Sequence, residues 1–178
     1  MFTGGSDVSP RLYGETCGKN TQCNWARDQL EVQWANYAID KGLPMLGICR
    51  GAQFLTVMAG GKLIQDVTDH CQTHEIYTTE GYERRANHPL LMSSTHHQMM
   101  HPYTLDKNLY KVIAFAQHRS KHYFNGGNQP IPHSGIEPEI VCYPRIKALC
   151  IQGHPESMDV ESGGVGFCQR LVKEYLCV

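Results

Sequence analysis

Apolar residues recur at steps of three and four along three stretches of the chain, residues 26–40, 51–59 and 160–176. That spacing gathers side chains on one face of an α-helix, so each stretch is predicted to be helical. Glycine follows the first two stretches closely, joined by proline after the first, and this is typical of the end of a helix.

The helix over residues 26–40 is expected to bury its apolar side and expose its polar side. The apolar residues expected to face inward are Leu30, Trp34, Ala35, Ala38 and Ile39. The polar residues expected on the opposite face are Arg27, Asp28, Glu31 and Asn36.

Short apolar runs bounded by glycine, proline or polar residues predict β-strands. The runs cover residues 43–48, 62–67, 110–116, 139–143 and 148–152. The second predicted helix separates the first two runs, and strand–helix–strand alternation is typical of a parallel sheet with helices on its faces. We therefore expect a three-layer α/β domain with a mostly parallel central sheet. The polar segments 68–102 and 120–135 are predicted to be mainly loops.

The length of 178 residues suits one domain with one core, and we find neither an internal repeat nor a linker. Hydrophobic residues make up 41% and charged residues 19%, which is the profile of a globular protein. A formal net charge of -1 gives no electrostatic reason to expect binding to nucleic acid or to an anionic membrane.

The eight cysteines are predicted to be free rather than disulfide-bonded. Cys142, Cys150 and Cys168 lie in apolar runs, where cysteine behaves as a small buried hydrophobe. The first residues lack the basic start and apolar run of a signal peptide, and no apolar stretch reaches the roughly 20 residues of a membrane span. These features predict a reduced, cytoplasmic enzyme.

The sharpest chemical signal is the sequence Gly-Ile-Cys-Arg-Gly at residues 47–51, between a predicted strand and a predicted helix. A nucleophile at such a turn adopts a strained backbone, and the flanking glycines allow neighbouring chains to approach. Cys49 would then point into solvent, and the N-terminus of the helix would stabilise a thiolate and a developing oxyanion. The alternative is a buried cysteine with glycines beside it by chance.

A cysteine nucleophile needs a base, and His154 lies just beyond the predicted strand 148–152. Active sites in open α/β sheets gather at the carboxyl ends of strands. Glu156 is spaced to hold one imidazole nitrogen and leave the other facing Cys49. A lone histidine is usually a capping or surface residue, but two matching features at two strand ends favour catalysis.

Together the two motifs resemble the triad motifs of class I glutamine amidotransferases. The resemblance is greater to the gamma-glutamyl hydrolase branch, which includes gamma-glutamyl-gamma-aminobutyrate hydrolases. Matching blocks occur in family order along nearly the whole chain. They are residues 4–14, 27–31, 42–53, 60–67 and 94–98.

The resemblance implies a flavodoxin-like sheet, no metal or organic cofactor, and a triad of Cys49, His154 and Glu156. Cys49 would attack a gamma-glutamyl amide and release glutamate through a thioester. The resemblance also implies an oxyanion hole and a binding site for the glutamyl group. The residues implied in these two roles are Gly4, Gly5, Arg50, Gln53, Ser94, His96 and His97.

The chain departs from the family's pattern in two ways. The family has asparagine at the positions of Thr56 and Ser93. Relatives also carry a strand, a helix and a strand before the Gly4–Gly5 turn, so residues 1–178 are interpreted as one N-terminally short domain of this type. Such a domain lacks the usual first strands, which leaves a sheet edge that needs cover.

Two features allow other interpretations. His70, Cys71 and His74 resemble half of a zinc site, but no second half follows, so the histidines are assigned to a loop over the active site. Arg50 is an alternative partner for a carboxylate of the substrate.

Three functions are compatible with these residues. The first is a hydrolase of small gamma-glutamyl compounds, and the second is a glutaminase subunit that supplies ammonia from glutamine to a partner synthetase. The third is a catalytically idle scaffold or binding protein, which the intact triad argues against. The leaving amine, and whether the chain forms a homo-oligomer, stay open.

Overall fold

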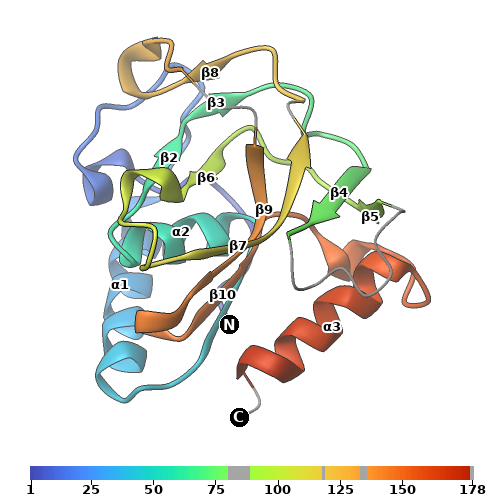
Figure 1. Cartoon of the computed structure of the whole chain (residues 1–178). Helices are drawn as coiled ribbons and strands as arrows, with labels where there is room; N and C mark the ends of the chain where they lie inside the picture. The colour runs from blue at the N-terminus through green and yellow to red at the C-terminus, as the bar shows by residue number, and fades with distance from the viewer. Residues whose placement is uncertain (80–88, 118, 133–135, 177–178) are drawn as a thin grey trace.

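The computed structural model describes residues 1–79, 89–117, 119–132 and 136–176 of the chain. Three α-helices lie within these ranges, and each confirms a predicted helix (Figure 1). They are α1 (Trp25–Asp40), α2 (Arg50–Met58) and α3 (Gly163–Leu176).

Each of the five predicted runs contains a strand, one run is interrupted, and four further strands of the described residues lie outside the runs. The strands are β1 (Met45–Ile48), β2 (Lys62–Ile64), β3 (Asp66–Val67), β4 (His74–Thr78), β5 (Leu90–Met92), β6 (Met99–His101), β7 (Lys111–Gln117), β8 (Tyr123–Phe124), β9 (Ile136–Tyr143) and β10 (Ala148–Ile151). The run at 62–67 is split at Gln65 into β2 and β3. The segments predicted to be loops contain β4, β5, β6 and β8, and their residues 80–88 and 133–135 lie outside the described part.

The central sheet has six strands in the order β1-β10-β9-β7-β4-β5. Among its described pairs, β1 and β10 are parallel and the others are antiparallel. The α/β class is therefore confirmed, but the expectation of a mostly parallel sheet is wrong. The reason is that β2 leaves the central sheet and pairs with β6, while a turn at Pro144–Ile146 folds β9 and β10 into a hairpin.

Helices cover both faces of this sheet, which gives the three layers seen in Figure 1. Side chains of β10 alternate between the faces, as the pleat of a strand requires. Ala148 and Cys150 join the apolar cluster that includes residues of α1 and α2. Leu149 and Ile151 join the cluster on the side of α3.

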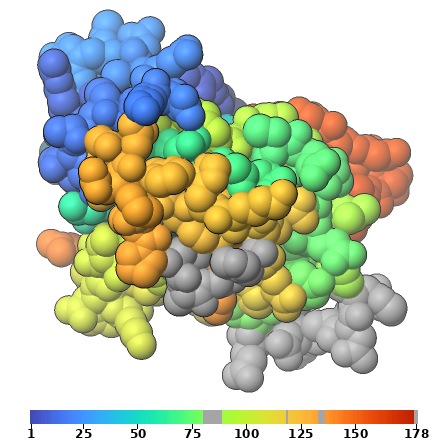
Figure 2. Space-filling model, turned by 90° about the horizontal axis from the view of Figure 1, so that it is seen from above, coloured from blue at the N-terminus to red at the C-terminus, as the bar shows by residue number. Residues whose placement is uncertain are grey.

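The outer segments pack around one end of the sheet. Figure 2 shows residues 119–132, in gold and orange, lying across this face beside the N-terminal residues in blue. Here β8 pairs with β3, and the Lys19 N–H donates to Asn128 Oδ1 over 3.1 Å. β1 is the edge strand at one end of the six-stranded sheet. Phe2 covers part of this edge through backbone hydrogen bonds to Leu46 and Ile48.

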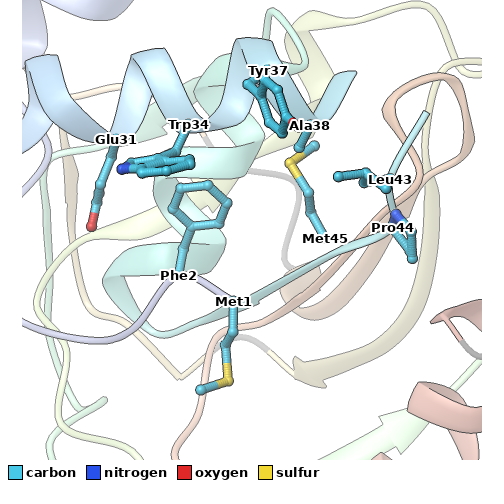
Figure 3. Close-up of a pocket in the computed structure, with 9 residues that line it drawn as sticks. All are labelled: Met1, Phe2, Glu31, Trp34, Tyr37, Ala38, Leu43, Pro44 and Met45. Carbon is cyan, nitrogen blue, oxygen red and sulfur yellow. The ribbon is translucent and has the colours of Figure 1, made fainter. Parts of the chain in front are cut away.

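The face of α1 expected to point inward is only partly right. Ala35 is fully buried and Ala38 and Ile39 pack against the core, as expected. Leu30 and Trp34 are instead 55% and 60% exposed, and Asp28 of the expected polar face is fully buried. Figure 3 shows Trp34 beside the ring of Phe2, at a surface pocket of ≈ 520 Å³ that both residues line.

Arg50 is the residue that turns the polar side of α1 inward. Its side chain is 1% exposed and forms ion pairs with Asp28 and Glu31. Burial raises the pKa of Asp28, against the hydrogen bond from the Ser9 N–H and the charge of Arg50. A buried guanidinium is costly unless it is paired, so this requirement overrides the apolar pattern of the helix.

The histidines expected in a loop over the active site are instead buried against β9. His70 and His74 are 0% and 3% exposed, and their rings contact the carboxylates of Glu137 and Glu139. Cys71 between them is exposed.

Glu137 is the best-satisfied of these buried carboxylates. It accepts hydrogen bonds from the backbone N–H groups of Arg119 and Ser120, from the Tyr123 hydroxyl and from His70 Nε2, all within 3.0 Å. Burial alone would raise the pKa of Glu137, but these donors outweigh it and lower the pKa to about 2.

We predict that Asp28→Asn lowers the free energy of unfolding by about 3 kcal/mol or more, because it leaves the buried Arg50 short of one counter-charge. Urea denaturation followed by circular dichroism measures the loss. Asp40→Asn, at an exposed position of the same helix, is the matched control and should change stability by about 0.5 kcal/mol or less. Equal losses in the two variants would contradict the role of the buried ion pairs.

We also predict that Glu137→Gln removes an acid-dependent part of the stability. A carboxyl whose folded pKa is lowered stabilises the fold above its ordinary pKa of 4.5, and that contribution is lost as the pH falls towards about 2. The difference in urea midpoint between wild type and variant should therefore be largest above about pH 5 and shrink below it. A difference that stays constant between these pH values would count against a lowered pKa.

Candidate active site

Cys49 occupies a sharp turn between β1 and α2. Its backbone angles, φ 51° and ψ -112°, are ones that residues other than glycine rarely adopt. A Cβ on Gly47 would lie 2.5 Å from the carbonyl oxygen of Gly51, and one on Gly51 would lie 2.2 Å from that of Phe2. These close approaches require glycine, so the predicted strained turn with its two flanking glycines is confirmed.

The sequence predicted that the thiol of Cys49 points into solvent, and this prediction is wrong. Cys49 is 7% exposed, and burial raises its pKa to about 11. The backbone N–H of Arg50, at the start of α2, acts in the predicted direction, but burial outweighs it and the carboxylate of Glu156 adds to the rise. The resting nucleophile candidate is therefore a neutral thiol.

The parallel pairing of β1 with β10 brings the two motifs to one edge of the sheet. Ile48 pairs with Ile151 at the strand ends, and the Cys49 N–H donates to the Ile151 carbonyl over 2.8 Å. His154 follows β10 closely, and its Nδ1 lies 2.7 Å from Glu156 Oε1. A carboxylate accepts at this distance, so Nδ1 carries the proton and Nε2 is left with a lone pair.

The backbone of Gly4 lies against both side chains. A Cβ at Gly4 would be 3.2 Å from His154 Cε1 and 3.7 Å from Cys49 Cβ, so these two atoms can be no farther apart than those distances combined. Among the described residues, no hydrogen bond joins the thiol to the imidazole. Such contacts are often long in a resting enzyme and tighten when substrate binds. The His154 backbone is fixed by its N–H, which donates to the Ser93 carbonyl over 2.8 Å.

Arg27 holds the glycine turn that approaches Cys49. Its guanidinium donates to the carbonyls of Gly4 and Thr3 at 3.0 and 2.9 Å. Gly5 has a φ of 140°, and a Cβ there would lie 2.3 Å from Arg27 Nη1. The turn therefore requires glycine both for its backbone conformation and for the space that the guanidinium fills.

Two residues implied in substrate binding direct their side chains elsewhere. The Arg50 guanidinium is buried in its ion pairs with α1, so the alternative that it faces a substrate carboxylate is wrong, and only its backbone N–H lies beside Cys49. Gln53 is 2% exposed, and its side-chain nitrogen donates to the Gln98 carbonyl over 2.8 Å.

The implied binding residues of segment 94–98 divide into buried and exposed side chains. Ser94 and His96 are 1% and 4% exposed, and the His96 ring stacks on that of His70. His97 reaches the surface, where its Nε2 lies 3.1 Å from the Asp7 carboxylate. That hydrogen bond raises the pKa of His97.

His97 and Gly5 meet in a surface pocket of ≈ 460 Å³ that the sequence analysis did not anticipate. Its charged lining comes from Asp7 and Asp66, which neither motif contains. The signal that could have found them is their place in the matching blocks 4–14 and 60–67, where carboxylates have no apolar packing role. Arg27 was likewise assigned to the solvent face of its helix.

In this chain a strained turn at Cys49 leads into a helix, and His154 follows the adjacent parallel strand. Solved structures of α/β proteins share the fold of this chain. A glutamine amidotransferase from Thermotoga maritima matches with a TM-score of 0.51 over 85% of this chain and 54% of that chain. The two are 16% identical, so the likeness concerns the fold alone. The flavodoxin-type architecture implied by the sequence is thereby confirmed.

The chain belongs to the Peptidase C26 family, whose profile matches residues 1–121. It is 44% identical to the glutamine amidotransferase-like protein YvdE of Lactococcus lactis over 69 residues, which are 38% of this chain and 29% of that protein. It is 41% identical to the gamma-glutamyl-gamma-aminobutyrate hydrolase PuuD of Escherichia coli over 58 residues, 33% of this chain and 22% of that one. The resemblance seen in the motifs is confirmed.

These likenesses support a hydrolase of the glutamine amidotransferase fold. The matches span less than a third of either curated relative. In the described part of the chain, no helix combines the length and the apolar character that crossing a membrane requires.

Proposed function

We propose that this chain is a cysteine-dependent hydrolase that cleaves gamma-glutamyl amide bonds through a thioester intermediate. The observation that carries the proposal is the meeting of Cys49 and the His154–Glu156 pair at the ends of two adjacent parallel strands. The family and the partial likeness to a gamma-glutamyl-gamma-aminobutyrate hydrolase support the substrate class.

The raised pKa of Cys49 determines how the first step would begin. A neutral thiol needs a base at the moment of attack, so His154 Nε2 takes the proton as the sulfur bonds to the amide carbon. His154 then passes this proton to the leaving nitrogen, and the C–N bond breaks to release the amine. Glu156 keeps the proton of Nδ1 in place and stabilises the transient imidazolium.

The second step would return the enzyme to its resting state. The amine's departure opens a path for water, which gives a proton to His154 as its oxygen bonds to the thioester carbon. The C–S bond then breaks, glutamate leaves, and the proton on His154 restores the neutral thiol. Every proton that the imidazole accepts is passed on, so the two steps balance in protons without a cofactor.

Two backbone N–H groups are candidates for the oxyanion hole. One is that of Arg50, at the start of α2 beside the sulfur. The other is that of Gly5: Arg27 holds the Gly4 carbonyl, and in a trans peptide the following N–H points the opposite way, free of Arg27. Donors fixed in this manner stabilise developing charge without reorganisation.

The acidic pocket beside Gly5 fits one end of a gamma-glutamyl substrate. That head group carries an ammonium at its α-carbon, and Asp7 and Asp66 supply opposite charge in the pocket. His97 pairs with Asp7 in the resting state and would orient it. The pocket and the oxyanion donor share Gly5, which links substrate binding to the reacting carbonyl.

A glutaminase subunit that supplies ammonia to a synthetase is the second candidate. The observation that favours it is the likeness to glutamine amidotransferase-like relatives such as YvdE. In that case the same residues would act on glutamine, and activity would depend on the partner. Deeply buried Cys49 is compatible with a nucleophile that a partner or substrate must uncover.

We predict that the isolated chain releases glutamate from gamma-glutamyl amines and that Cys49→Ala lowers the rate by more than about a thousandfold. Glutamate release from gamma-glutamyl amines and from glutamine is measured side by side. Cys23→Ala, at an exposed cysteine, is the matched control and should retain full activity.

Other results would redirect the assignment. Turnover of glutamine that requires an added synthetase would favour the glutaminase subunit. No turnover, together with no labelling of Cys49 by a glutamine analogue bearing an electrophile, would leave a scaffold or binding protein.

We predict that Arg27→Met lowers kcat by about tenfold to a hundredfold with little change in KM, because it frees the Gly4–Gly5 peptide that positions an oxyanion donor. Arg27→Lys should recover part of the loss. Arg11→Met, which removes an exposed arginine stacked on Trp25, is the matched control. If kcat and KM of Arg27→Met equal those of the control, Arg27 has no positioning role.

A further inference from the structure

Among the described residues, three side chains that lie close together each have a buried polar atom without a hydrogen-bond partner. The atoms are His70 Nδ1, His96 Nε2 and Glu139 Oε2. Their residues are 0%, 4% and 1% exposed. One ligand atom from each of the three residues lies within 4.8 Å of the others. Buried polar groups normally find partners, so this cluster needs an explanation.

Hydrogen bonds on the outer side of each ring determine which nitrogen holds a proton. His96 Nδ1 lies 2.7 Å from the Gln98 carbonyl, which can only accept, so Nδ1 carries the proton and Nε2 a lone pair. His70 Nε2 lies 3.0 Å from Glu137, a carboxylate that three other groups also donate to, so Nε2 carries the proton and, in the neutral ring, Nδ1 is a lone pair.

A hydrogen bond to one carboxylate oxygen also orients Glu139. His74 Nε2 lies 2.9 Å from Glu139 Oε1, which leaves Oε2 directed away from its only hydrogen-bond partner among the described residues. The closest approach to His70 is 3.5 Å, from Nδ1 to Oε1, and it is not a hydrogen bond. Three side chains with an unpartnered acceptor therefore lie close together, and no donor of the described residues reaches those atoms.

Neither one water molecule nor one added proton alone would give all three atoms a partner. Water has two O–H groups and would leave one of the three acceptors unsatisfied. A second proton on His70 would serve its contact with Glu139 but would leave His96 Nε2 without a partner. A divalent cation can satisfy all three at once.

We propose that His70, His96 and Glu139 bind a divalent transition-metal ion of the zinc type. Two imidazoles and one carboxylate are ligands that zinc favours, and each ligand already has the outer hydrogen bond that orients ligands at metal sites. Bonds of about 2.1 Å require ligand atoms within roughly 4 Å of one another, so the three groups close in by less than about 1 Å.

The ion would connect three separate segments of the chain. His70 precedes β4, His96 lies in segment 94–98, and Glu139 belongs to β9. Ser93, which directly precedes that segment, accepts the backbone hydrogen bond of His154. The metal would therefore stabilise the support of the candidate base, which is a structural role distinct from the proposed chemistry. The half-site inferred from the sequence shares only His70 with this set. Cys71 is exposed, and the buried His74 contacts Glu139, so neither is a ligand in it.

Metal retention tests the proposal without reference to enzyme activity. Chelator-treated protein is incubated with a small excess of Zn²⁺, desalted and analysed for bound metal, and Co²⁺ loading is followed by visible absorption. We expect about one ion per chain, a Co²⁺ spectrum without a thiolate charge-transfer band, and a rise in melting temperature of about 5 °C or more. His96→Gln and Glu139→Gln should each retain less than about a tenth as much.

Control variants separate this site from adventitious binding. The exposed cysteines are removed together in Cys17→Ser/Cys23→Ser/Cys71→Ser, and the surface histidine beside Asp66 in His122→Gln. Both variants should retain the metal. The proposal is overturned if the wild-type chain keeps no metal after desalting, or if either control variant loses it. The wild-type measurement decides the question even if a cluster variant does not fold.

Discussion

The pairing of the buried Arg50 guanidinium with two carboxylates of α1 is the interaction on which the rest of the candidate site depends. Arg50 directly follows Cys49, so the pairing fixes the start of α2 relative to α1. Glu31 also binds Arg27 Nε at 2.9 Å, and Arg27 in turn holds the Gly4 carbonyl. One helix face thus sets both the turn that carries the nucleophile and the loop that approaches it.

This network explains which features of the site could be predicted from the sequence. The flanking glycines of Cys49 predict close backbone contacts, and those contacts are local, so the turn was predicted correctly. The burial of Cys49 depends on the Gly4 loop, which is distant in sequence. The exposure of Cys49 was therefore not predicted correctly. Apolar spacing placed α1 correctly along the chain and identified Ala35 as buried. It wrongly put Leu30 and Trp34 inward and Asp28 outward, because an apolar pattern takes no account of a buried cation on another helix.

The sheet shows the same division between local and distant information. Four of its six strands, β1, β7, β9 and β10, were predicted at nearly the right residues, since each is a short apolar run, whereas β4 and β5 lie in a segment predicted to be mainly loop. The partners of the strands depend on where the chain goes between them. The hairpin of β9 and β10, and the departure of β2 to pair with β6, make a mixed sheet from a strand–helix–strand pattern that is typical of parallel ones. The histidines near β4 were misplaced for a similar reason: their partners lie on β9.

The burial of Cys49 also bears on how the protein withstands oxidants. Peroxide and most alkylating reagents react with the thiolate, and a pKa raised to about 11 leaves very little of that form at neutral pH. Cys17, Cys23 and Cys71 are exposed and would meet such reagents first. The sulfur at the strained turn is thus shielded from sulfenic acid formation while the protein is idle, and becomes vulnerable only when a substrate or a neighbouring base withdraws its proton.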